Sequence, residues 1–300
     1  MKPAKRAGAR RHQRKLKRTR MKTVHKLALA RIAYRNIHIA RALVGRSDRC
    51  LATRNGVTYD LDLSQGIDLA IYLGNMFERG TQNALRKWVK PGSFVLDVGA
   101  NIGAHSLPLA QLVGPSGRVL SFEPTDYAYR KLRRNLDLNP ELAPRITTFQ
   151  CFLAGQDDAS VPDSIYSSWP LTEQDNLHAK HQGQAMPTNK ARALSIDGVL
   201  AQLSNPIVQL VKLDVDGFET EVLRGATGLL RDSRPVFLME LSPYVLDERG
   251  SSLEELLACF APYNYRFYHE RSERLLPLEP AALRRLVGDG ASINVIARAG

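Results

Sequence analysis

The chain has few cysteines and no long hydrophobic run. Its 300 residues include three cysteines, Cys50, Cys151 and Cys259, which form neither a C-x-x-C pair nor a disulfide framework. A scattered, odd number of cysteines favours a reducing compartment such as the cytoplasm over secretion. No stretch of about 18 uncharged apolar residues occurs, so no membrane-spanning segment is expected. Hydrophobic residues still make up 44% of the chain, which is enough for a substantial core.

Acidic residues are missing from the start of the chain. Residues 1–49 contain 17 Lys and Arg and one acid, Asp48, whereas the remaining residues carry a net charge of −4. Residues 2–22 are too polar to form a core. Residues 24–44 can form a helix with one apolar side, which consists of Leu29, Ile32, Ala33, Ile39, Ala40 and Leu43.

The sequence of residues 1–49, which we call the basic extension, is compatible with three arrangements. The helix can lie at a membrane interface, it can pack on the domain by its apolar side, or the segment can be an organelle transit peptide. We expect an anchoring extension that is separate from catalysis and binds an anionic membrane surface or another polyanion. The expected location is therefore the cytoplasm, with the option of a peripheral position at a membrane.

Strand and helix patterns alternate beyond the extension. Asn55-Gly56 predicts a hairpin, and residues 50–92 are expected to form this hairpin and a helix leading into the core. Residues 93–300 are expected to form one α/β domain, a doubly wound, mostly parallel sheet covered on both faces. Strands are expected at 94–96, 118–122, 146–152, 193–196, 207–213, 236–240 and 293–297, and helices at 80–89, 104–112, 126–136, 219–230 and 253–260.

A polar stretch at about 156–190 interrupts the alternation. It lacks periodicity and contains Tyr166, Trp169, His178 and His181. Long inserts in compact domains are more often functional than idle, and this one is expected at the carboxyl ends of the strands. We interpret it as a lid that contacts the substrate through these four residues; the alternative is a passive excursion.

The sequence Val95 to Gly103 predicts a nucleoside-cofactor pocket. A buried strand ends in Asp97 and turns through Gly99, Asn101 and Gly103 into a helix, and the next strand ends in Glu123, where an acid can bind a ribose diol. A dinucleotide fold requires glycine where Asn101 stands, and Asp97 would repel a pyrophosphate. An acid there instead attracts the cationic methionine part of S-adenosylmethionine, which is the cofactor we expect. The adenine is then expected beside Leu153 and Ala154.

A second acidic group follows the strand at 207–213. Asp214 and Asp216 project to one face, and Glu240 ends the next strand at the same edge of the sheet. Neighbouring carboxylates raise one another's pKa, which suits a base that accepts a hydroxyl proton. The alternative is that Asp216 and Gly217 only form the turn and cap a helix. The ligand set is incomplete for a divalent cation, so no metal site is expected. His105 is a weaker candidate for the base.

These motifs resemble the FkbM family of S-adenosylmethionine-dependent methyltransferases. VLDVGANIG, SFEPTDYAYRKLRRN, LSIDGVL and VKLDVDGFETEVLRGA carry the resemblance, which spans about 220 residues ending near INVIA. It implies a Rossmann-like sheet of seven strands with the last one antiparallel, and methyl transfer to a hydroxyl of a sugar or secondary metabolite. It also implies that Asp97, Gly99, Asn101, Gly103 and Glu123 bind the cofactor. Many members have Glu where this chain has Asp216.

The sequence thus predicts a methyltransferase that methylates a hydroxyl group. The expected acceptor is a small molecule or glycan: a sugar, a glycolipid or a secondary metabolite. Asp214, Asp216 and Glu240 are the predicted catalytic residues. Two alternatives remain open, an RNA methyltransferase that uses the basic extension and a non-catalytic protein that retains the cofactor pocket.

Overall fold

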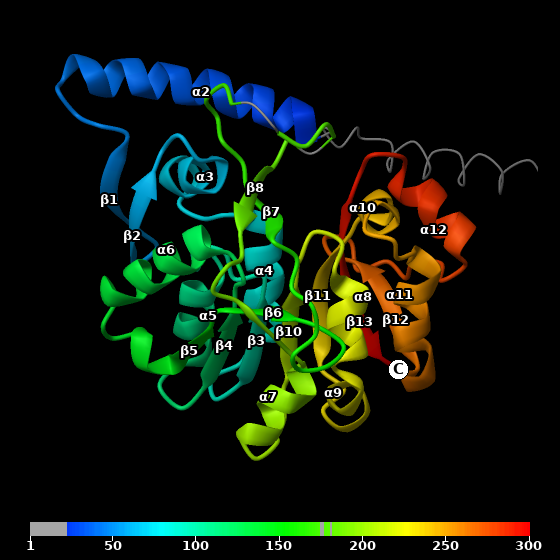
Figure 1. Ribbon diagram of the computed structural model, residues 1–300. Coiled ribbons are helices and arrows are strands. Elements are labelled where there is room, and N and C mark those ends of the chain that lie inside the picture. Colours follow the sequence, from blue (N-terminus) through cyan, green and yellow to red (C-terminus); the bar gives the residue numbers. More distant parts are fainter. Residues whose placement is uncertain (1–22, 175–176, 181) are drawn as a thin grey trace, which may run out of the picture.

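A seven-stranded sheet forms the centre of the computed structural model, which describes residues 23–174, 177–180 and 182–300 (Figure 1). Only β13 runs antiparallel to its neighbours; the other pairs are parallel. The predicted Rossmann-like α/β fold is therefore confirmed, including its antiparallel last strand. The strand order is β12 (Tyr265–His269), β13 (Ile293–Ala299), β11 (Val236–Leu241), β10 (Leu210–Leu213), β3 (Phe94–Val98), β4 (Arg118–Phe122) and β5 (Ile146–Phe149).

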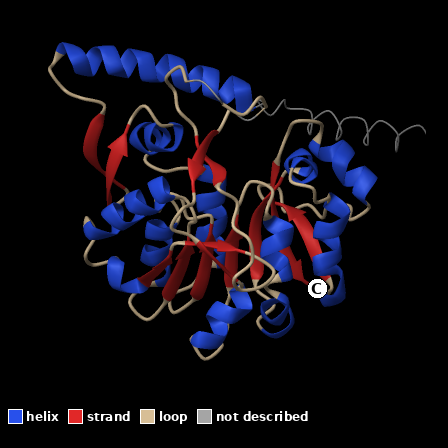
Figure 2. Ribbon diagram, in the orientation of Figure 1, coloured by secondary structure: helices blue, strands red, loops and turns tan. Residues whose placement is uncertain are grey.

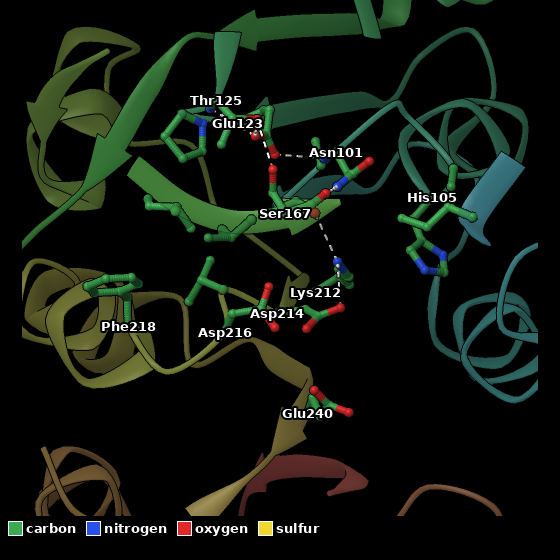
Figure 3. Close-up of a pocket in the computed structure, with 18 of the residues that line it drawn as sticks. Asn101, His105, Glu123, Thr125, Ser167, Lys212, Asp214, Asp216, Phe218 and Glu240 are labelled. Carbon is green, nitrogen blue, oxygen red and sulfur yellow. Dashed lines mark hydrogen bonds and ion pairs between the residues drawn. The ribbon is translucent and has the colours of Figure 1, made fainter. Parts of the chain in front are cut away.

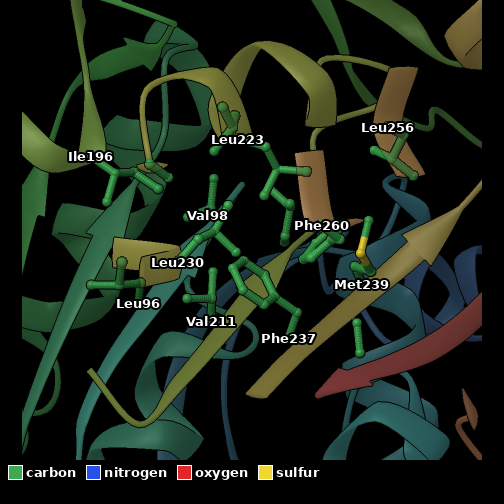
Figure 4. Packing of buried hydrophobic residues seen from close by; sticks show 14 of the residues in the cluster. Leu96, Val98, Ile196, Val211, Leu223, Leu230, Phe237, Met239, Leu256 and Phe260 are labelled. Carbon is green, nitrogen blue, oxygen red and sulfur yellow. The ribbon is translucent and has the colours of Figure 1, made fainter. Parts of the chain in front are cut away.

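Helices cover both faces of this sheet (Figure 2). Successive strand residues point to opposite faces, so Val95 and Leu96 belong to different clusters of buried side chains. The cluster around Leu96 includes Phe237 and Phe260 (Figure 4). Its helices are α7 (Ile196–Gln202), α8 (Glu219–Arg224), α9 (Thr227–Asp232), α10 (Pro243–Glu248), α11 (Leu253–Phe260) and α12 (Pro280–Val287). The cluster around Val95 includes α4 (Arg79–Trp88), α5 (Ser106–Val113) and α6 (Asp126–Asp137).

The N-terminal helix α2 (Thr23–Leu43) packs on the Val95 side of the domain, over α3 (Gly66–Gly74) and near the hairpin of β1 (Arg49–Arg54) and β2 (Val57–Asp62). Leu27 is only 8% exposed and belongs to the core cluster, and Tyr34 donates a hydrogen bond to Asp48. Of the three arrangements expected for the extension, α2 therefore adopts the one in which the helix packs on the domain. Residues 2–22 lie outside the described part of the chain.

The face of α2 that packs inward differs from the apolar side read from the sequence. Leu27, Ala30, Ala33, Tyr34 and Ile37 contact the core cluster. Of the predicted apolar side, the large residues Leu29, Ile32, Ile39 and Leu43 are exposed instead. Both sides of the helix carry hydrophobic residues, and the domain covers one of them.

Several elements differ from the sequence-based expectation. The expected strand at 146–152 is divided into β5 and β6 (Cys151–Leu153), and β6 pairs with β9 (Arg192–Leu194) outside the main sheet. The insert contains an antiparallel pair, β7 (Ser164–Ser168) and β8 (Gln184–Pro187). The expected helix at 219–230 is divided at Gly225, where a Cβ would lie 2.1 Å from the carbonyl oxygen of Ala154. The edge strand β12 was not predicted.

Candidate active site

A cavity of about 460 Å³ lies at the carboxyl ends of the parallel strands. Segments that follow β3, β4 and β10 form its floor, together with the end of β11 and strand β6. Leu27 and Ala30 of α2 and Trp169 of the insert line it as well. Doubly wound folds bind ligands at this edge of the sheet.

The glycines of the turn after β3 are required by packing within the protein. Gly99 has φ +79°, and a Cβ on it would lie 1.9 Å from the carbonyl oxygen of Asp214. Gly103 has φ +86°, and its Cβ would lie 2.8 Å from Leu132; it does not line the cavity. Gly99 and Asn101 do line the cavity. The turn therefore needs glycine at 99 because β10 comes close, a reason that the sequence pattern alone did not reveal.

Glu123 is a buried carboxylate held in place at the cavity wall (Figure 3). It accepts hydrogen bonds from the Asn101 amide (2.9 Å), the Thr125 amide (2.9 Å) and the Thr125 hydroxyl (2.5 Å). Burial raises the pKa of Glu123, and these hydrogen bonds oppose the rise. A carboxylate has about four acceptor positions, so one remains for a ligand hydroxyl.

Lys212 is a buried cation that sequence reasoning missed. Its ammonium donates to the carbonyl oxygen of Gly99 (3.1 Å) and lies 3.3 Å from Asp214 Oδ2 and 3.8 Å from Asp97 Oδ1. Burial lowers the pKa of Lys212, but Asp214 and Asp97 outweigh that effect and raise it. The side chain ties the ends of β3 and β10 together. Only the spacing in the sequence could have indicated its pairing with Asp214, because residues 212 and 214 lie on the same face of a strand.

Asp97 lies behind the cavity wall. Its Oδ2 accepts from the Ser106 hydroxyl (2.5 Å), which in turn accepts from the Ser121 hydroxyl (2.9 Å). Asp97 is fully buried and is not among the residues that line the cavity. The direct contacts of this predicted cofactor residue are therefore with Ser106 and Lys212.

Asp214, Asp216 and Glu240 form an acidic wall of the cavity, as Figure 3 shows. Burial and the charge of Asp214 raise the pKa of Glu240 to about 8, although Ser292 donates a hydrogen bond to it. Burial and neighbouring carboxylates also raise the pKa of Asp216 well above its ordinary range. Glu219 instead caps the turn, since it accepts from the amides of residues 215 and 217. No group of metal-binding side chains occurs among the residues that the structure describes.

Glu78 and His105 also line the cavity, and Gln82 supports His105 from behind. The Gln82 amide nitrogen donates to the Ala104 carbonyl (3.2 Å) and lies 3.0 Å from His105 Nδ1, so Nδ1 is the acceptor and Nε2 carries the proton. That Nε2 is 3.6 Å from Glu78 Oε2. Burial raises the pKa of Glu78, but His105 and Lys212 outweigh it and hold the pKa at about 2. His105 therefore has no free lone pair toward Glu78. Neither Glu78 nor Gln82 was predicted as a site residue.

The structure brings only part of the predicted lid to the cavity. Trp169 lines it, and so does Ser167, whose carbonyl accepts from the Asn101 side chain (2.8 Å). Tyr166 and His178 instead pack on each other at a centroid distance of 4.9 Å, and His178 lies 3.2 Å from Glu248. His181 lies outside the described residues.

The predicted adenine-binding segment is close to the cavity. Leu153 and Phe152 line it, and Phe152 packs edge-on against Phe218 at 5.1 Å. Ala154 does not line the cavity, because its carbonyl packs against Gly225. The lining here is an apolar slot, whose character suits an aromatic base.

The sequence model of the methyltransferase FkbM domain matches residues 97–267, more than half of the chain. The chain belongs to the FkbM methyltransferase family. The match includes the glycine turn, Glu123 and the acidic segment at 214–216, the same residues that build the cavity. This FkbM protein is therefore a methyltransferase with S-adenosylmethionine as its cofactor.

Solved structures of methyltransferases are similar to this FkbM protein. The FkbM methyltransferase of Methylobacillus flagellatus is 16% identical, with 72% of this chain and 50% of that chain covered and a TM-score of 0.41. An S-adenosylmethionine-dependent O-methyltransferase of Thermotoga maritima is 15% identical (85% and 87% covered, TM-score 0.40). TYW2 of M. jannaschii, in complex with AdoMet, is 14% identical (85% and 86% covered, TM-score 0.40). A search of curated proteins found no match.

The residues around the cavity fit this cofactor. The Glu123 carboxylate retains an acceptor position for a ribose hydroxyl, and the slot at Phe152, Leu153 and Phe218 suits an adenine. The acidic wall suits a positively charged sulfur and ammonium, since Lys212, which lies 3.3 Å from Asp214, is shared with Asp97.

Proposed function

We propose that this FkbM protein transfers a methyl group to a hydroxyl oxygen of a sugar, glycolipid or secondary metabolite. The observation that carries the proposal is the acidic wall, three carboxylates at the end of the cavity beside the cofactor turn. Two of them, Asp216 and Glu240, have raised pKa values. A carboxylate whose pKa is close to the operating pH is an effective acceptor for a hydroxyl proton.

The proposed cofactor site consists of Glu123 for the ribose, Phe152 and Leu153 for the adenine, and the turn at 99–101 for the methionine part. Asp97 acts from behind the wall in this proposal, because it holds Lys212 and Ser106 in place. The cofactor supplies a methyl group bonded to a positively charged sulfur. The protein aligns the two reactants, an effect that can lower the barrier by roughly 7–11 kcal/mol.

Glu240 is the proposed general base of the acidic wall. Its pKa of about 8 gives it a substantial ionised fraction at slightly alkaline pH. Lys212 stabilises the charge of Asp214, which suits Asp214 to orienting a hydroxyl by accepting its hydrogen bond. Ser292 fixes the orientation of the Glu240 carboxyl by donating to it. Proton removal by a positioned base contributes typically about 10²–10⁴-fold to the rate.

The lining of the remaining cavity indicates an acceptor with an apolar part. Leu27, Ile67, Ala70, Phe77 and Trp169 are apolar residues of its lining. An acidic wall repels phosphates, which argues against RNA as the acceptor, although the basic extension favours a polyanionic partner. We propose that residues 1–49 bind such a partner while the cavity binds a small molecule or glycan.

The test uses labelled donor and fractionated acceptor extracts. Wild-type protein should label a hydroxyl-bearing fraction, and Glu240→Gln should lower turnover by about 10²–10⁴-fold while cofactor affinity changes less than about tenfold. Glu141→Gln, at an exposed position, is the matched control and should leave turnover unchanged. Near-normal turnover in Glu240→Gln, Asp214→Asn and Asp216→Asn alike would contradict the assignment. Label in RNA would favour the RNA methyltransferase, and cofactor binding with no labelled fraction would favour the scaffold.

A further inference from the structure

The outer side of α2 carries a stripe of exposed hydrophobic residues. Leu29, Ile32, Ile39 and Leu43 are 54%, 61%, 49% and 82% exposed, and we call these four residues the outer stripe. Their spacing of three, seven and four residues places them on one side of a helix. Figure 1 shows α2 along one edge of the molecule, with α3 and the body of the domain on its other side. Contiguous apolar surface of this kind marks an interaction site.

The inner side of the same helix is occupied, so rotation of α2 cannot bury the outer stripe. Leu27 is buried in the core cluster, and Tyr34 donates to Asp48 (2.8 Å). Arg41 donates to the Ser47 carbonyl (2.9 Å), which fixes the end of the helix. Within residues 23–300, as far as the structure describes them, four large apolar side chains therefore remain uncovered.

Charge identifies the partner of this surface. Residues 2–22, which precede α2 in the sequence, contain eleven Lys and Arg and no acid. Arg35 and Arg46 add exposed positive charge on and after the helix. A cationic sequence that leads into a helix with an apolar stripe complements a surface with negative headgroups above hydrocarbon. RNA would satisfy the charges alone and leave the stripe uncovered.

We propose that the outer stripe of α2 binds the protein to an anionic lipid bilayer. The helix lies in the plane of the interface with its outer stripe among the acyl chains, and Asn36, which lies between Ile32 and Ile39, keeps the insertion shallow. Among the described residues, no helix is long and apolar enough to cross a membrane. Since Leu27 and Ala30 line the cavity from the other side of α2, this binding brings the cavity wall close to the lipid surface.

The experiment measures how much of the 300-residue protein sediments with lipid vesicles. The vesicles consist of phosphatidylcholine alone or of phosphatidylcholine with about 30% phosphatidylserine, which supplies the anionic headgroups. Wild-type protein should bind the phosphatidylserine vesicles at least about tenfold more tightly, and salt should weaken binding because it screens exposed charges. Replacing the outer stripe by four glutamines (Leu29→Gln, Ile32→Gln, Ile39→Gln, Leu43→Gln) should lower the partition coefficient by at least about tenfold. Arg10→Gln, Arg11→Gln, Arg14→Gln and Lys15→Gln together should also lower it.

The matched control replaces four exposed apolar residues of the body by glutamine: Leu203, Ile207, Leu275 and Leu278. It should bind like wild type, and the circular dichroism spectra of all variants should agree. Equal vesicle binding by the stripe variant would overturn the proposal, and so would a wild-type protein that does not bind phosphatidylserine vesicles. A wild-type dimer that the stripe substitutions convert to a monomer would overturn it too, because a second copy then covers the stripe. Tight RNA binding that abolishes vesicle binding without requiring the stripe would also count against it.

Discussion

Two leucines on opposite sides of α2 make a direct test of how this helix belongs to the domain. Leu27 is 8% exposed, contacts the core cluster and lines the cavity, whereas Leu29 is 54% exposed. The substitutions Leu27→Ala and Leu29→Ala remove the same atoms from the same helix. Any difference between them therefore reports the packing of α2 and not its helix propensity.

The expected magnitude follows from burial. Truncating a buried leucine to alanine costs roughly 2–5 kcal/mol, and the cost is lower where little new cavity is enclosed. Leu27 already borders a cavity, so we expect Leu27→Ala to lower the free energy of unfolding by about 2–3 kcal/mol. Leu29→Ala should change it by less than about 0.5 kcal/mol.

Urea unfolding monitored by tryptophan fluorescence suits this comparison. Both tryptophans, Trp88 and Trp169, pack against the cluster that contains Leu27. The Leu27→Ala midpoint should shift to lower urea with an unchanged slope. A midpoint shift no larger than that of Leu29→Ala would refute the conclusion that α2 is part of the core, and the helix would then be a detachable extension.

Three further predictions concern the cavity. Turnover should rise with pH through about 8 as Glu240 ionises. The pH–rate profile of Glu240→Gln should lack this rise, and if the rise remains, another residue is the base. The free energy of unfolding should change in the opposite direction, because the pKa of Glu240 is higher in the folded state than in the unfolded state. It should fall between about pH 4.5 and 8 in the wild-type protein, since the unfolded state loses this proton first. It should fall less in Glu240→Gln, and urea unfolding at a series of pH values measures both. Lys212→Met should lower the free energy of unfolding by about 3–5 kcal/mol, because it leaves Asp97 and Asp214 without their cation. Urea unfolding measures this loss, and a loss below about 1 kcal/mol would contradict the pairing.

The sequence predicted the sheet and the position of the cavity because both depend on local patterns. Buried strands that end in an acid or a glycine turn, as at Asp97 and Gly99, show both the strand and the ligand edge. The edge strand β12 was missed because it reads Tyr-Arg-Phe-Tyr-His, in which Arg266 is exposed and no continuous apolar run exists. The division at Gly225 depends on the approach of Ala154, a contact between segments that are remote in the sequence.

The candidate site was only partly predictable for the same reason. Asp214 and Glu240 follow strands, and their common edge could be inferred. The pairing of Glu78 with His105 depends on how α4 packs against α5, which no local pattern specifies. The orientation of α2 was ambiguous in principle, because hydrophobic residues occupy both of its sides and only tertiary contacts choose between them.

The charges around the cavity lead to a prediction about cofactor binding itself. Lys212 forms an ion pair with Asp214 of the acidic wall, and it is shared with Asp97. Burial and the neighbouring carboxylates raise the pKa of Asp216, and burial with the charge of Asp214 raises that of Glu240 to about 8, so Glu240 keeps its proton near neutral pH. A cation that enters the cavity stabilises the ionised form of these carboxyls. Binding of S-adenosylmethionine should therefore release protons at pH 7.5.

Isothermal titration calorimetry in buffers of different ionisation enthalpy measures this release, because each proton passed to the buffer adds the buffer's heat. S-adenosylmethionine should release more protons than S-adenosylhomocysteine, since only the former carries a charged sulfur. Glu240→Gln should reduce the difference between the two ligands, and Glu141→Gln, at its exposed position, should not. Equal release for both ligands in the wild-type protein would mean that the sulfur lies away from Glu240 and Asp216. The acidic wall would then have to serve the acceptor alone, and its raised pKa values would persist after the cofactor has bound.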